Sequence, residues 1–288
     1  MNGILNLNKP AGYTSFDCVA VMRRLTGERK IGHTGTLDPQ ATGVLPICIG
    51  KATRLLEFMD STPKTYVCGC TLGVETDTQD IWGSVIRSES PETASVTRET
   101  VEKVLDTFRG EIDQKPPVFS AVKIKGKKLY EYARAGQEVD IPARRVTVYR
   151  IRLLDWQGPD NPFTFEIVCS RGTYVRAVCH DLGQRLGVGA CMSSLVRTAA
   201  CGYAIEHAVS LDELQEMDLR EIEALLDPPE TAVAHLPGFE LEEAAADLFI
   251  NGNPKWSEGL SLSDGVQAAY SQGKLIGIIR DGKIAKVL

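Results

Sequence analysis

One aspartate, Asp38, stands in a segment whose residue types restrict the backbone without favouring a helix or a strand. Residues 32–46 read Gly-His-Thr-Gly-Thr-Leu-Asp-Pro-Gln-Ala-Thr-Gly-Val-Leu-Pro. The glycines permit positive φ angles and close approach, while Pro39 fixes its own φ and disfavours a helical conformation at Asp38. The sequence therefore predicts a carboxylate held in a set place with little bulk above it, as close contact with a substrate requires. An Asp-Pro turn without further function is the alternative.

Four other stretches carry motifs in a fixed order along the chain. They are Gly3-Ile4-Leu5-Asn6-Leu7-Asn8-Lys9-Pro10 followed by Gly12, then Lys64-Thr65-Tyr66, Lys115-Pro116-Pro117-Val118-Phe119-Ser120-Ala121 and Arg171-Gly172-Thr173-Tyr174-Val175-Arg176. Together with the Asp38 segment, they resemble the bacterial TruB branch of the pseudouridine synthases over nearly the whole chain. Gln40 stands where leucine is common in that family, and this departure does not affect the expected chemistry.

The resemblance implies an enzyme that converts uridine to pseudouridine at position 55 in the T arm of tRNA. It also implies that no metal, nucleotide or redox cofactor is needed. The reaction breaks the N1–C1′ bond, rotates the base and rejoins it through C5. A base within folded RNA must first be extruded and then held while it is detached. Such a site needs a carboxylate, an aromatic wall, a cation that keeps the carboxylate ionised, and apolar closure against water.

The family motifs assign these parts to particular residues. Asp38 corresponds to the essential aspartate, which either attacks C1′ or removes a ribose proton. Arg176 is expected to pair with Asp38 and lower its pKa, with an exposed helix arginine as the alternative. Tyr66 is expected to stack on the uracil, with a buried strand tyrosine as the alternative. The expected catalytic residues are Asp38, Tyr66 and Arg176, and the expected substrate-binding residues are His33, Lys64, Tyr66, Lys123, Arg144, Tyr174 and Leu195.

The distribution of charge indicates a polyanionic partner despite a net charge of −6. Residues 115–152 hold ten Lys or Arg against three acidic residues, whereas residues 206–247 hold thirteen acidic residues against one arginine. A basic segment in an acidic chain is typical of a nucleic-acid site, and a solvated charged face is the alternative. By resemblance, residues from about 123 to 145 form an RNA-gripping thumb whose basic side chains contact phosphates. Those side chains are Lys123, Lys125, Lys127, Lys128, Arg144 and Arg145.

The elements that position these residues alternate irregularly between strands and helices. This pattern favours an α+β fold with a mixed or antiparallel central sheet and flanking helices. Strands are expected at 4–8, 44–49, 64–72, 82–86, 146–156 and 163–170, and helices at 15–25, 52–59, 97–109 and 173–186, with two short ones in 206–235. Alternating runs at 275–279 and 283–287 predict a small β-rich module. We expect a catalytic domain over 1–235 and, by resemblance, a PUA-like RNA-binding domain over 237–288.

Cysteine usage and hydropathy indicate a reduced, intracellular setting. The eight cysteines form no CxxC pair and mostly lie among apolar residues, which is typical of buried thiols in a cytosolic protein. A zinc site at Cys68 and Cys70 is disfavoured because no histidine lies nearby at ligand spacing. The N-terminus shows no signal-peptide pattern, and no apolar run approaches the roughly 20 residues of a membrane span. We expect a cytoplasmic monomer without a membrane or an obligate protein partner.

Two other functions compete with this interpretation. The guided enzyme of H/ACA ribonucleoprotein complexes shares the Asp38 loop, but it carries a longer C-terminal module and basic extensions. A non-catalytic RNA chaperone or binding protein is disfavoured by the complete set of Asp38, Tyr66 and Arg176. Help with tRNA folding could nevertheless coexist with catalysis.

Overall fold

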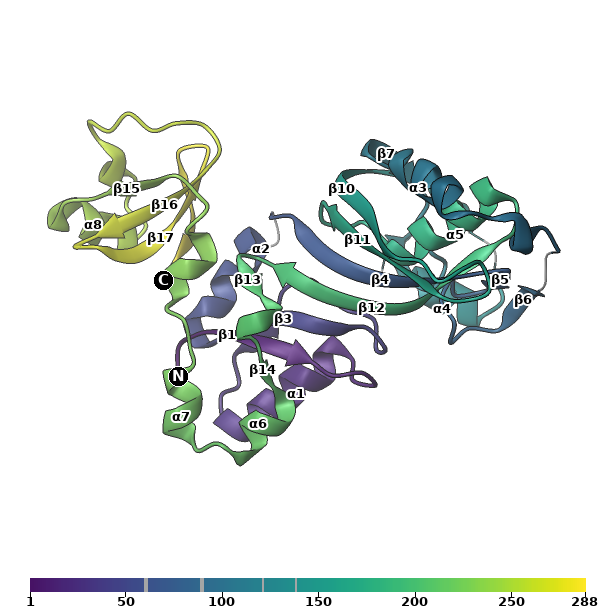
Figure 1. Cartoon of the computed structure of the whole chain (residues 1–288). Coiled ribbons are helices and arrows are strands. Elements are labelled where there is room, and N and C mark those ends of the chain that lie inside the picture. The colour runs from purple at the N-terminus through teal and green to yellow at the C-terminus, as the bar shows by residue number, and fades with distance from the viewer. Residues whose placement is uncertain (60–61, 89–90, 121, 138) are drawn as a thin grey trace.

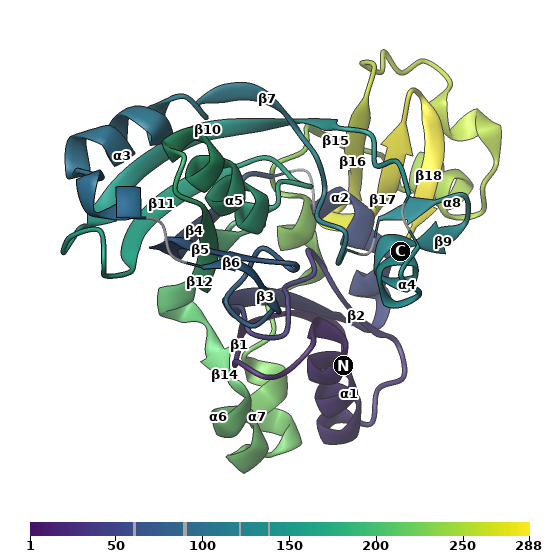
Figure 2. The same cartoon turned by 90° about the vertical axis from the view of Figure 1, so that its right-hand side faces the viewer.

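A ten-stranded mixed sheet forms the body of the protein (Figure 1; Figure 2). The computed structural model describes residues 1–59, 62–88, 91–120, 122–137 and 139–288. The main path of the sheet runs β14 (Val209–Ser210), β1 (Gly3–Lys9), β3 (Thr42–Ile49), β12 (Ala190–Ala200), β4 (Lys64–Leu72), β11 (Phe163–Cys169), β10 (Arg144–Asp155) and β7 (Gly110–Gln114), with β2 (Ile31–His33) beside β3 and β13 (Tyr203–Ala204) beside β12. Strand β1 pairs in parallel with β14, and β3 pairs in parallel with β12, while the other described pairings of this sheet are antiparallel. This architecture confirms the expected α+β class and mixed central sheet.

Helices cover the two halves of the sheet separately. Near β1, the helices α1 (Ser15–Thr26), α6 (Leu211–Glu216) and α7 (Leu219–Ala224) pack on one apolar core. Near β4 and β11, the helices α3 (Arg98–Asp106) and α5 (Val175–Leu186) pack on another. Shorter helical segments are η1 (Gly50–Leu55), α2 (Leu56–Met59), η2 (Pro91–Ser95), η3 (Ile205–His207) and η4 (Pro229–Val233). Among the described residues, no helix combines the length and apolar character needed to cross a membrane.

The short helix expected at 52–59 is helical throughout, as the end of the 3₁₀ helix η1 followed by the single turn α2. Two other sequence expectations about element boundaries were wrong. Helix α3 begins after its N-cap Thr97 as predicted, but it ends at Asp106 rather than at 109. The strand expected at 82–86 is displaced to β6 (Val85–Ser88), which pairs with β5 (Val74–Thr76). The displacement arises because the Asp77 carboxylate accepts the Ser84 amide at 2.8 Å and closes a turn between the strands.

The basic segment forms a hairpin followed by a short helix. Strands β8 (Lys123–Ile124) and β9 (Lys127–Lys128) pair antiparallel, and α4 (Leu129–Arg134) follows directly. Lys125 and Gly126 connect the strands with φ angles of 49° and 85°, as a tight two-residue hairpin turn requires. Ala121 and Glu138, which fall within the motif and the thumb segment predicted from the sequence, lie outside the described residues.

A second, four-stranded sheet occupies the C-terminal residues (Figure 1). It contains β15 (Gly238–Glu240), β16 (Val266–Ser271), β17 (Lys274–Arg280) and β18 (Lys283–Val287), with α8 (Glu243–Ile250) and η5 (Pro254–Ser257) packed beside them. Phe249 and Trp256 meet edge to face in its own core. Because this sheet has its own apolar core, it can be described as a structural unit of the chain.

The C-terminal unit is also joined to the body by an apolar contact. Ala268 of β16 and Ile278 of β17 are fully buried in one cluster with Ile4 and Phe58 of the body. At the rim, the Glu57 carboxylate lies 2.9 Å from Nζ of Lys286 and 3.5 Å from Nη2 of Arg280. The ion pairs are half-exposed and contribute little, so apolar burial provides most of the stabilisation at this junction.

Candidate active site

Asp38 lies in the loop between β2 and β3, and buried polar groups hold the loop on both sides of it. The hydroxyl of Ser15, at the start of α1, accepts a hydrogen bond from the Leu37 amide at 2.9 Å and donates one to the Leu37 carbonyl at 3.2 Å. Nζ of the fully buried Lys9 donates to the Pro39 carbonyl at 2.9 Å. The residues before and after Asp38 are thus fixed, and the carboxylate projects from a restrained backbone.

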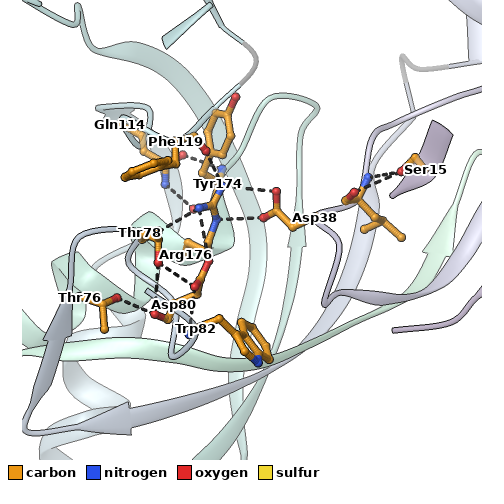
Figure 3. A network of polar contacts seen from close by, with 11 residues as sticks. Ser15, Asp38, Thr76, Thr78, Asp80, Trp82, Gln114, Phe119, Tyr174 and Arg176 are labelled. Atoms are coloured by element: carbon orange, nitrogen blue, oxygen red, sulfur yellow. Dashed lines mark hydrogen bonds and ion pairs between the residues drawn. The ribbon is translucent and has the colours of Figure 1, made fainter. Parts of the chain in front are cut away.

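Arg176 meets this carboxylate with two nitrogens. Its Nε lies 2.9 Å from Oδ2 of Asp38, and its Nη2 lies 3.4 Å from Oδ1. Figure 3 shows the two side chains pointing toward one another from opposite walls of the site. Only 5% of the Arg176 side chain is exposed, so the alternative of a solvated helix arginine is wrong. The two-point geometry fixes the orientation of the carboxylate as well as attracting it.

The first turn of α5 is itself anchored, which places Arg176. Tyr174 is the N-cap residue of α5, and its amide donates to Oε1 of Gln114 at 2.7 Å. Nε2 of Gln114 returns a hydrogen bond to the Tyr174 carbonyl at 3.0 Å. This reciprocal pair of hydrogen bonds ties the start of α5 to β7. The backbone that carries the Arg176 side chain is therefore held in position.

Asp80 is a site residue that the sequence analysis missed. Its Oδ2 lies 3.5 Å from Nη1 of Arg176, and the Thr78 carbonyl accepts from the same nitrogen at 2.9 Å. The Phe119 carbonyl accepts from Nη2 at 3.1 Å. The available signal was the polar turn at residues 76–80, in which Oγ1 of Thr78 donates to Oδ1 of Asp80 at 2.7 Å. Arg176 therefore bridges two carboxylates, one from each side.

The protonation of Asp38 reflects opposing influences. Burial raises the pKa of Asp38 above its usual value, although the cavity mouth leaves 42% of the side chain exposed. The charges of Arg176 and Lys9 lower this pKa, and the charge of Asp80 raises it. From the sequence, Arg176 is expected to lower this pKa, but desolvation outweighs its attraction and the pKa of Asp38 is raised. The site thus holds a carboxylate whose ionisation depends on its cationic neighbours.

These residues line one cavity of about 260 Å³. Asp38 and Arg176 form part of its wall, and four other residues named from the sequence join them. Those four are Lys64, Tyr66, Tyr174 and Leu195. Lys64 and Tyr66 are two residues apart on β4, so both side chains face the same side of the sheet. The cavity, which Arg197 of β12 also lines, therefore combines a carboxylate, three cations, aromatic rings and an aliphatic side chain.

Three of the residues named from the sequence lie away from this cavity. His33 ends β2 and is half-buried, and burial together with Arg197 lowers its pKa. Lys123 in the basic hairpin and Arg144 at the start of β10 are exposed. The structure therefore brings six of the nine predicted positions together and leaves these three on surrounding surfaces.

The cysteines are placed as the composition suggested. All eight are buried and free of disulfide bonds. Burial raises the pKa of Cys48 to about 12 and that of Cys169 to about 11, so these thiols stay protonated and unreactive near neutral pH. Within the described part of the chain, no group of three His, Cys, Asp or Glu side chains is arranged to hold a metal ion.

The same fold occurs in solved H/ACA ribonucleoprotein structures. A Cbf5–Nop10–Gar1 complex aligns with 99% of this chain and 84% of that chain, at 26% identity and a TM-score of 0.72. An H/ACA ribonucleoprotein bound to a substrate RNA containing 2′-deoxyuridine aligns with 96% and 77%, at 25% identity and a TM-score of 0.71. The fold, together with an aspartate–arginine pair in a cavity beside the sheet, is that of the pseudouridine synthases.

Sequence comparison gives the family within this class. A model described as the N-terminal domain of TruB family pseudouridylate synthases matches residues 23–175, and a tRNA pseudouridylate synthase B C-terminal domain model matches residues 176–234. Proteins named tRNA pseudouridine synthase B from Geobacillus kaustophilus and Bacillus anthracis are 49% and 44% identical over 257 residues. These alignments span 88% of this chain and 90% and 83% of those proteins. The chain belongs to the TruB family of pseudouridylate synthases.

Replacing Asp80 by asparagine should lower kcat by about 10- to 100-fold, with KM changed by less than about threefold. Asparagine keeps the shape of the turn but removes the second carboxylate that holds the Arg176 guanidinium. The measurement is steady-state turnover on a T-arm RNA, with the exposed Asp155→Asn as a matched control. Wild-type kcat in Asp80→Asn would show that the carbonyls of Thr78 and Phe119 suffice to place Arg176.

Proposed function

We propose that this enzyme converts uridine to pseudouridine at position 55 in the T arm of tRNA, with Asp38 as its essential aspartate. The observation that carries the proposal is the two-point contact between Asp38 and Arg176 at the wall of a cavity that also presents Tyr66 and Leu195. The names of the bacterial relatives supply tRNA as the substrate class. The position within tRNA comes from the family motifs around Asp38.

The cavity suits one extruded nucleotide. Its volume of about 260 Å³ lies below the range that drug-sized ligands occupy, and its wall combines apolar and charged side chains. Tyr66 and Leu195, which are 8% and 7% exposed, offer two surfaces against which a flat base can lie. A base held there is shielded from water while its glycosidic bond is broken.

The chemistry is an isomerisation, so atoms balance within the nucleotide. The N1–C1′ bond breaks, a C5–C1′ bond forms, and the proton on C5 leaves while N1 gains one. Asp38, kept ionised by Arg176, either attacks C1′ or removes a ribose proton, and both routes require the carboxylate form. Tyr66 is the aromatic side chain that we assign to contact with the ring during rotation.

The basic hairpin is assigned to RNA binding. Nζ of Lys127 lies 5.9 Å from the centre of the Tyr132 ring, and Nζ of Lys128 lies 5.3 Å from that of Tyr130. These contacts order two lysines on one short element, as a phosphate-binding surface requires. We propose that residues 123–145 act as a thumb on the RNA and that His33 contributes binding beside the catalytic loop.

We propose a division into a catalytic domain at 1–235 and a PUA-like RNA-binding domain at 237–288. The separate four-stranded sheet and its own core support this boundary. We further propose that the enzyme works as a cytoplasmic monomer on tRNA alone. The alternative of a guided ribonucleoprotein enzyme is supported by the solved complexes, and a requirement for added protein or guide RNA would favour it.

A direct test uses an unmodified tRNA transcript labelled with tritium at C5 of its uridines. Because the reaction removes hydrogen from C5, the purified chain alone should release one label per tRNA. A transcript with cytidine at position 55 should release none. Release from that second transcript at the wild-type rate would overturn the assignment to position 55, and binding without release from either would favour an RNA chaperone.

Binding should weaken steeply with salt despite the acidic composition of the chain. Neutralising Lys123, Lys125 and Arg144 together to glutamine should reduce the slope of log K against log salt by about two to three, because each phosphate contact adds about 0.7 to 0.9. Matched changes at the exposed Arg98, Lys103 and Arg109, on or after α3, should leave the slope unchanged. An unchanged slope in the hairpin variant would move the RNA path to another surface.

A further inference from the structure

A second buried arginine, Arg197, lies beside the catalytic loop without an acidic partner. It is on β12 and is 0% exposed. Among the described residues, no Asp or Glu forms an ion pair with it, and its Nη2 atom has no hydrogen-bond partner. Removing a guanidinium from water without a counter-charge is costly. The burial of Arg197 without an ion pair therefore indicates that its remaining hydrogen bonds have a structural or functional role.

Its two other nitrogens hold the ends of the Asp38 loop. Nη1 donates to the Gly35 carbonyl at 2.7 Å, and Nε donates to the Val44 carbonyl at 2.7 Å. These two carbonyls belong to residues on opposite sides of Asp38 in the sequence. One rigid planar group therefore sets the distance between the loop at Gly35 and strand β3 at Val44.

Gly35 and Gly43 leave free the space that Arg197 occupies. A Cβ atom on Gly35 would lie 3.0 Å from Nη1 of Arg197, and one on Gly43 would lie 2.3 Å from its carbonyl oxygen. Both glycines also have positive φ angles, of 67° and 100°. The glycine spacing that makes the loop recognisable in the sequence thus provides the room in which Arg197 sits.

The same strand supplies the apolar wall of the cavity. Leu195 lies two residues before Arg197 on β12, and Arg197 is paired in register with Tyr66 of β4 and with Gly43 of β3. The backbone of Arg197 therefore connects three parts of the cavity: Tyr66, Leu195 and the loop that carries Asp38.

We infer that Arg197 is a positioning residue, which fixes the Asp38 loop relative to the surfaces of Tyr66 and Leu195. The inference rests on the proposed role of Asp38. Arg197 acts on the reaction through the backbone of the loop, while Arg176 acts on the carboxylate itself. Loss of Arg197 should consequently impair turnover more than RNA binding.

The test compares Arg197→Met and Arg197→Lys in the full chain, on a T-arm RNA. Methionine fills similar space without hydrogen bonds and should lower kcat by about 100-fold while KM changes by less than about threefold, since an error of about 1 Å in a reacting group has that effect. Lysine keeps the charge but cannot reach both carbonyls, and it should lose less. Hydrogen exchange of the amides at 35–44 should become faster in both variants.

Leu214→Ala controls for a general loss of stability, because Leu214 is buried in α6 within an apolar core that contains neither Tyr66 nor Leu195. At a matched loss of Tm, this variant should keep its kcat and its exchange at 35–44. If kcat in Arg197→Met falls no further than in Leu214→Ala, or if kcat falls while loop exchange is unchanged, the inference is overturned.

A second variant covers the case in which Arg197→Met does not fold. Gly35→Ala strains the loop backbone at a φ of 67° and brings a Cβ atom to 3.0 Å from Nη1 of Arg197, so it should reproduce the loss in kcat together with faster exchange at 35–44. Wild-type kcat in Gly35→Ala would count against the inference. The proposed function fails separately, through an inactive wild-type chain or an active Asp38→Asn variant.

Discussion

Turnover should be lost when Asp38 is replaced by asparagine, while RNA affinity should stay within a few-fold of wild type. Asparagine has the same shape but cannot act as a nucleophile or as a base at the ribose. The phosphate contacts assigned to the basic hairpin are distant in sequence and outside the cavity, so ground-state binding should survive. Single-turnover conversion of a T-arm RNA should fall below about a hundredth of the wild-type rate.

The matched control for this variant is Asp160→Asn, which alters an exposed aspartate on the loop after β10. Its rate and affinity should equal those of the wild type. Thermal unfolding of Asp38→Asn should remain cooperative, because Arg176 keeps its contacts to Asp80 and to the carbonyls of Thr78 and Phe119. A folded Asp38→Asn enzyme that turns over above a hundredth of wild type would show that the carboxylate lacks the proposed role.

Two features of the sequence predicted the site: local backbone chemistry marked the loop around Asp38, and the family motifs assigned roles to Tyr66, Arg176 and Leu195. Glycines and Pro39 mark an irregular loop around Asp38, and the motif that includes Arg176 starts at a helix boundary. Alternation on β4 puts Lys64 and Tyr66 on one face without any knowledge of the strands beside it. The fold class followed in the same way, from the irregular order of strands and helices.

The remainder depended on contacts between segments that are distant in sequence. Asp80 reaches Arg176 only because residues 79–81 are bound to β12, where the Met192 carbonyl accepts the Ile81 amide at 2.8 Å. Arg197 gains its role because β12 lies between β3 and β4, an order that no local pattern specifies. The direction of the Asp38 pKa was missed for a related reason, since desolvation depends on every wall of the cavity.

Replacing Arg176 by methionine should lower kcat at pH 7 by about 10³-fold and move the acid limb of the pH–rate profile to higher pH. The direction of this shift follows from the groups that raise or lower the pKa of Asp38. Burial and Asp80 raise the pKa of Asp38, and Arg176 is the larger of the two cationic influences that lower it. Without the guanidinium, the pKa of Asp38 rises further, and a smaller fraction of the enzyme holds the required carboxylate at any acidic pH.

Arg176→Lys separates charge from geometry at the same position. Lysine keeps a positive charge near Asp38, so the acid limb should move less than in Arg176→Met. It cannot contact both carboxylate oxygens and Asp80 at once, so kcat on the alkaline plateau should still fall. The control is Arg185→Met, on the exposed face of the same helix. If the acid limb of Arg176→Met coincides with that of the wild type while kcat falls, Arg176 orients Asp38 without controlling its ionisation.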